Sequence, residues 1–98
     1  MAAHLETVAA ALARAGAHVE EAKLPPSFEG LLAAGGTVMR AEAAAYHAPR
    51  FEKHAAEYRP KIREAIDLGR AVSAIEYLDA SAHLREFRLE ADRLARGY

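Results

Sequence analysis

The arrangement of this chain depends on residues 12–28, which have the sequence LARAGAHVEEAKLPPSF. The stretch contains the end of a helix, a stop at Gly16, a short strand and a proline-marked turn into the next helix. We expect the strand over about residues 17–24, because Val19 lies between polar neighbours and Pro25 ends the run. Extended coil is the alternative. The rest of the chain has helical patterns, so the strand lacks a partner in its own chain and its free backbone groups favour pairing elsewhere.

The composition indicates a single small domain with a thin core. Of 98 residues, 52% are apolar, but alanine supplies much of this share and buries little surface. The net charge of −1 argues against a general nucleic-acid or membrane-surface role. The chain has no cysteine, no signal-peptide pattern and no long apolar run, so we expect a cytoplasmic protein.

The helices are predicted from apolar spacing and from their stop signals. A first helix over about residues 3–15 places Leu5, Val8 and Leu12 on one face. A second helix begins after Ser27, its predicted N-cap. It should end near His47, because proline disfavours helical geometry in the residue before it.

Two glycines interrupt the apolar stripe of this second helix. Gly35 and Gly36 each cost about 1 kcal/mol relative to alanine in a helix interior. We expect the helix to continue through them and to admit a closely packed neighbour at this point.

The second half of the chain is predicted to be helical as well. Residues 50–57 should form a short helix or a turn, and Pro60 fits the first turn of a helix that stops at Gly69. The last helix begins with a capping box formed by Ser73 and Glu76. The predicted fold is therefore mainly α, with four to five helices and one short β-strand.

One polar residue lies on an apolar stripe. Glu42 continues the stripe of the second helix, and a carboxylate on a buried face needs a hydrogen-bonding or charged partner. We interpret it either as a residue at the edge of the stripe or as a structural buried carboxylate that ties this helix to a neighbour, through an arginine for example.

The unpaired strand and the long last helix are the predicted interfaces. The last helix has an apolar seam, and its length suits it to anchor a bundle or a dimer. We expect a homodimer that uses the strand or this helix. The interface residues predicted are Val19, Leu24, Tyr77, Leu84, Phe87 and Leu94.

No catalytic or metal-binding apparatus can be identified from the residues. The five histidines form no His-Glu-x-x-His pattern, and no cysteine assists them. Ser27 and Ser73 have capping roles, and no Gly-x-Ser-x-Gly elbow, phosphate loop or dinucleotide fingerprint occurs. We expect no cofactor, no metal and no catalytic residue.

The order and spacing of several motifs resemble the amidase signature family. The similar stretches are AALARAGAHVEEAKLP (10–25), MRAEAAAYH (39–47), YRP (58–60), IDLG (66–69) and SAIEYLDA (73–80). The resemblance covers the chain from about Val8 to Tyr98. It lies in the region downstream of that family's catalytic core.

The resemblance implies a large α/β fold whose members hydrolyse amides or transfer ammonia, the latter within the glutamyl- and aspartyl-tRNA amidotransferases. The family uses a Ser-Ser-Lys triad, and no residue of this chain matches a triad position. The expectation is a non-catalytic segment of an amidase-like C–N hydrolase, inactive alone and forming one domain over residues 1–98. The alternative from the residues is a free-standing helical protein–protein interaction module that docks through its last helix.

Overall fold

The computed structural model describes all residues from Met1 to Tyr98 and is built from helices without any strand. The α-helices are α1 (Ala2–Arg14), α2 (Leu31–His54), α3 (Pro60–Arg70) and α4 (Ala74–Arg96). Two short 3₁₀ helices, η1 (Pro26–Phe28) and η2 (Ala55–Glu57), flank α2. The mainly helical prediction is confirmed, and the predicted strand is wrong.

The first helix ends as its glycine predicts. Gly16 adopts a φ of 101°, which L side chains rarely take. The amide of Ala17 donates to the carbonyl of Leu12, and the amide of Gly16 donates to that of Ala13, at 3.0 and 3.1 Å. These two bonds form a Schellman motif, which satisfies the last carbonyls of α1.

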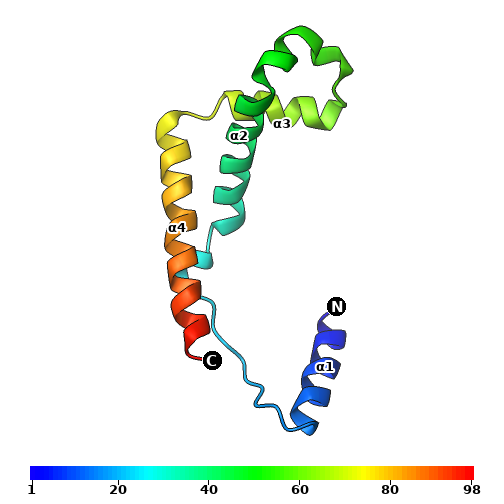
Figure 1. The fold of residues 1–98 in the computed structure, drawn as a ribbon, viewed down its shortest axis with the longest axis vertical. Coiled ribbons are helices and arrows are strands. Elements are labelled where there is room, and N and C mark those ends of the chain that lie inside the picture. The colour runs from blue at the N-terminus through cyan, green and yellow to red at the C-terminus, as the bar shows by residue number, and fades with distance from the viewer.

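Residues 17–24 form an exposed linker in place of the predicted strand. None of residues 18–24 takes part in a backbone hydrogen bond, so no ladder exists within the chain. A strand requires a second strand, and every other element of this chain is helical. The linker separates α1 from the remaining helices, as Figure 1 shows.

The second helix begins later and ends later than predicted. Its N-cap is Gly30, with a φ of 75°, whereas Ser27 lies in η1. The helix then continues through Gly35 and Gly36, as predicted, and also past Pro49 to His54.

The burial of Phe51 accounts for the helical course beyond Pro49. Phe51 is buried beside Ala44 and Ile66, and its ring lies 5.4 Å from that of Tyr58. Continuing the helix places this aromatic ring in the core, and its burial offsets a proline penalty of roughly 3 kcal/mol. Tertiary packing therefore overrides the local signal.

The helices α2, α3 and α4 form an open hook. The chain turns back through η2, so that α3 crosses α2, and α4 then runs antiparallel beside α2 (Figure 1). The start of α4 is the predicted capping box: the amide of Glu76 donates to the Ser73 hydroxyl at 3.0 Å, and the amide of Ser73 donates to the Glu76 carboxylate at 3.3 Å.

The molecule is elongated and has little interior. Its radius of gyration is 19.5 Å, compared with about 13 Å for a compact domain of this length. Only seven of the 98 residues are buried, and Ile66 is the only large side chain without exposed surface. Most apolar side chains of this fold consequently face solvent.

Candidate functional site

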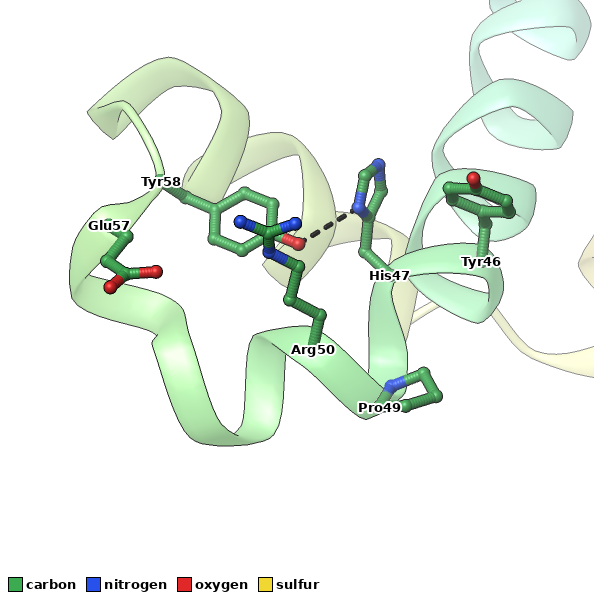
Figure 2. A pocket seen from close by; sticks show the side chains of 6 residues that line it. All are labelled: Tyr46, His47, Pro49, Arg50, Glu57 and Tyr58. Atoms are coloured by element: carbon green, nitrogen blue, oxygen red, sulfur yellow. Dashed lines mark hydrogen bonds between the residues drawn. The ribbon is translucent and has the colours of Figure 1, made fainter.

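The largest cleft lies where α2 continues past Pro49 and the chain turns through η2. It has a volume of about 590 Å³ and is drawn in Figure 2. Its walls come from the last turns of α2 and from the segment that precedes α3. The lining residues are Tyr46, His47, Pro49, Arg50, Glu57 and Tyr58.

A hydrogen-bonded aromatic pair forms one wall of this cleft. His47 Nδ1 and the Tyr58 hydroxyl lie 3.0 Å apart and point toward each other in Figure 2. The two rings are almost perpendicular, with centroids 5.4 Å apart, and Tyr46 meets the His47 ring edge-on at 5.0 Å. Tyr58 also contacts buried Phe51, so the core fixes the position of this wall.

Arg50 is the one cationic side chain of the cleft that has no ion-pair partner. Glu57 lies 3.3 Å from His54 Nδ1, whereas no carboxylate of the chain pairs with Arg50. The guanidinium of Arg50 offers planar donors that suit a carboxylate or phosphate. The cleft can therefore bind an anionic group through Arg50. Its lining contains no serine, cysteine or lysine that could act as a nucleophile.

A second hollow lies at the opposite end of α2 and is mainly apolar. It has a volume of about 480 Å³ and is formed by the segment that enters α2 and by the first turn of the helix. The lining residues are Leu24, Pro25, Pro26, Phe28, Glu29, Gly30, Leu31, Leu32 and Ala33.

Contacts with α4 hold the segment beside this hollow in place. The Ser27 hydroxyl donates to Glu90, and His83 Nε2 lies 2.7 Å from the Ser27 carbonyl oxygen. Because a carbonyl oxygen only accepts, Nε2 of His83 carries the hydrogen. The Phe28 and Phe87 rings pack at 6.0 Å. Sequence reasoning missed the pairing of Ser27 with Glu90, since 63 positions separate these residues and no local pattern links them.

Glu42 is exposed, which fits its interpretation as a residue at the edge of the stripe and corrects the alternative of a buried carboxylate. It does tie α2 to α4, because the Tyr77 hydroxyl donates to its Oε1 at 2.8 Å; the partner is a tyrosine rather than an arginine. This hydrogen bond raises the pKa of Tyr77 above its ordinary value, and Ser81 acts in the opposite direction.

The predicted interface residues divide into two groups. Val19 and Leu24 are exposed on the linker. Tyr77, Leu84, Phe87 and Leu94 are half-buried on α4. Tyr77 contacts Glu42 and Phe87 contacts Phe28, so two residues of the predicted docking seam are used within the chain.

The remaining polar groups do not converge on a reaction centre. No group of three or more His, Cys, Asp or Glu side chains is placed to hold a metal ion. Ser73 serves as a cap and Ser27 contacts Glu90, so each has a structural role. None of the helices has the length and apolar character needed to cross a bilayer.

Comparison with known proteins does not assign a family to the chain. It matches no family model, no curated protein and no solved structure.

Proposed function

We propose that this chain is a non-catalytic helical segment of an amidase-like C–N hydrolase, and that it acts in the cytoplasm. It would join the remainder of such an enzyme through its N-terminal arm, which we define as residues 1–25. The observation that carries the proposal is the exposure of this arm. Every one of its residues faces solvent except Ala9 and Pro25, which are half-buried.

The helical part of the arm offers an amphipathic face without a partner. Leu5, Val8 and Leu12 lie on one side of α1 and are 61, 42 and 51% exposed. An isolated helix of 13 residues is marginal in water, so packing of this face against another surface would supply most of its stability.

The linker part of the arm offers a free backbone. Residues 18–24 make no backbone hydrogen bond, and His18 Nε2 lies 3.2 Å from Glu20 Oε2. A contact between side chains two residues apart is typical of locally extended chain, in which alternate residues share a side. Extended backbone with free donors and acceptors suits addition to the open edge of a partner's sheet. A sheet is what the resemblance to amidases implies for the partner.

The chain contributes docking rather than chemistry in this proposal. Its serines and histidines have structural contacts or lie apart from each other, and the resemblance supplies no triad residue. We therefore expect the isolated chain to have no amidase activity.

A free-standing helical interaction module is the second candidate. The seam from Tyr77 to Leu94 is a poor docking surface for such a module, because part of it packs within the chain. The observation in its favour is the exposure of three large apolar side chains on one side of α4, Ile75, Leu78 and Leu89, which are 73, 62 and 60% exposed.

Fragment complementation tests the proposal. The purified chain is mixed with an amidase signature enzyme from which the corresponding segment has been deleted, and binding and amide hydrolysis are measured. We expect the chain to bind and to restore hydrolysis. Leu12→Asp should abolish both effects, whereas Thr7→Asp, on the opposite side of α1, should preserve them.

Each result separates the two candidates. Absence of binding to any such deleted enzyme would refute the amidase proposal. Binding without restored hydrolysis, abolished by Leu78→Asp and unaffected by Leu12→Asp, would favour the interaction module.

A further inference from the structure

A second unpartnered stripe runs along α2, on residues that the proposed function does not use. Leu32, Met39 and Tyr46 are spaced seven residues apart, and their exposures are 89, 63 and 81%. A seven-residue repeat drifts by only about 20° on an α-helix, so the three side chains share one face. We call this face, with the small residues between them, the α2 stripe.

The small residues of the α2 stripe leave room beside its large side chains. A Cβ on Gly35 would meet no atom within 4 Å, and one on Gly36 would meet the Arg40 guanidinium at 2.9 Å, the end of a flexible side chain that can move aside. Two glycines weaken a helix by about 1 kcal/mol each. Large side chains that alternate with such gaps are the pattern by which two helices interlock.

We propose that two copies of this chain pair through the α2 stripe, with the two helices antiparallel. The stripe is complementary to itself in this orientation. Met39 of one copy packs over Gly36 of the other and displaces the flexible Arg40 guanidinium that lies there, and Leu32 faces Ala43. A two-fold axis repeats both contacts, so a single pairing fills the gaps of both helices.

The ends of α2 are complementary as well. Continuing the same register places Tyr46 of one copy beside Glu29 of the other, at the apolar hollow that Leu32 and Phe28 help to form. The exposed ring enters this hollow with its hydroxyl toward the Glu29 carboxylate. Arg50 follows one turn later on the same side of α2.

The charges at these ends fit the same register. Neither Glu29 nor Arg50 has an ion-pair partner within its own chain. In the antiparallel pair, the Arg50 guanidinium of one copy lies near the Glu29 carboxylate of the other, twice per dimer. The polar cleft and the apolar hollow thus become the two ends of one interface.

The size of the interface sets the expected affinity. With 24 residues, α2 is about 36 Å long, and a contact strip about 10 Å wide buries roughly 700 Å² over both copies. The contacts at the two ends enlarge this area toward the roughly 1,000 Å² at which specific interfaces begin. We therefore expect a weak, concentration-dependent dimer. The pairing uses only Leu24 and Pro25 of the N-terminal arm, which line the hollow, and leaves α1 free. It does not depend on the amidase assignment.

Sedimentation equilibrium of the full chain tests the pairing. Gly36→Leu fills the gap for Met39 and should weaken dimerisation at least tenfold, while circular dichroism shows an equal or more stable helix, because leucine favours helix over glycine. This combination excludes misfolding as the cause of the lost dimer.

Charge reversal tests the register. Glu29→Arg and Arg50→Glu should each weaken the dimer about two- to fivefold, and the double variant should regain the lost affinity, as expected for partly exposed ion pairs. Lys61→Glu, on exposed α3, should have no effect. A monomer at every concentration, a dimer insensitive to Gly36→Leu, or a double variant weaker than both single variants would overturn the proposal.

Discussion

Gly69 of α3 lies against the backbone carbonyl of Arg40 in α2, so closely that a Cβ at this position would overlap the carbonyl oxygen. The same Cβ would also lie 3.0 Å from the Cβ of Ala44. Gly69 is buried, and it sets the distance at which α3 crosses α2. The hook therefore closes at a contact of backbone against backbone.

We expect Gly69→Ala to lower the free energy of unfolding by about 1–3 kcal/mol, because α3 must move away from α2. Chemical denaturation monitored by circular dichroism measures the change. Gly35→Ala is the matched control, since a Cβ there meets no neighbour and the higher helix propensity should stabilise α2 by about 1 kcal/mol. Equal effects of the two substitutions would contradict the close crossing.

Because the core is small, Phe51→Ala should strongly lower the free energy of unfolding. Its ring is buried between α2 and α3 and packs against Tyr58, and the loss of such a ring lowers stability by about 3–5 kcal/mol. This is a large fraction of the roughly 5–15 kcal/mol that stabilise a typical domain, and a chain with only seven buried residues should lie at the low end, so we expect the hook to unfold. Ile75→Ala, at a position that is 73% exposed, should change the free energy of unfolding by less than about 0.5 kcal/mol.

Tyr77 should titrate at a higher pH than an ordinary tyrosine, because its hydroxyl donates to the Glu42 carboxylate. The fold favours the protonated phenol, so its stabilisation is present below the ordinary pKa of about 10 and is lost as the pH rises through the raised value. Nuclear magnetic resonance of the ring measures this pKa. Glu42→Gln should lower it, whereas Glu52→Gln should leave it unchanged.

The start of α4 should depend on its capping box. Ser73→Ala removes the acceptor for the Glu76 amide and should lower stability by about 0.5–2 kcal/mol. Hydrogen exchange at the Glu76 amide should become faster. Ser73→Asp keeps an acceptor at this position and should preserve the slow exchange; fast exchange in both variants would argue against the cap.

Signals that act within one turn were sufficient to predict several boundaries from the sequence. Gly16 ends α1, Pro60 begins α3 and Ser73 begins α4, because each satisfies or removes backbone groups of its immediate neighbours. Two local signals failed: Ser27 lies in η1 and does not cap α2, and Pro49 does not end α2. The local effect of Pro49 is overridden by the burial of Phe51 against α3, which only the folded hook reveals.

The features that sequence reasoning missed depend on distant partners. The strand over 17–24 was wrong because pairing is a property of two segments, and the chain supplies only one. Of the two interpretations of Glu42, the edge of the stripe fits its exposure and the buried carboxylate does not, because so open a molecule has almost no interior. The cleft of His47 and Tyr58 joins residues across a reversal of the chain that η2 creates.

The detachment of α1 has a consequence for how the molecule melts. Because α1 has no buried residue, packing against the hook does not stabilise it. We therefore expect α1 to unfold at a lower temperature than the other helices. A thermal scan of ellipticity would then show an early, shallow loss from α1, followed by a steeper transition of α2, α3 and α4. A single midpoint fitted to the whole curve would mix two independent equilibria and describe neither.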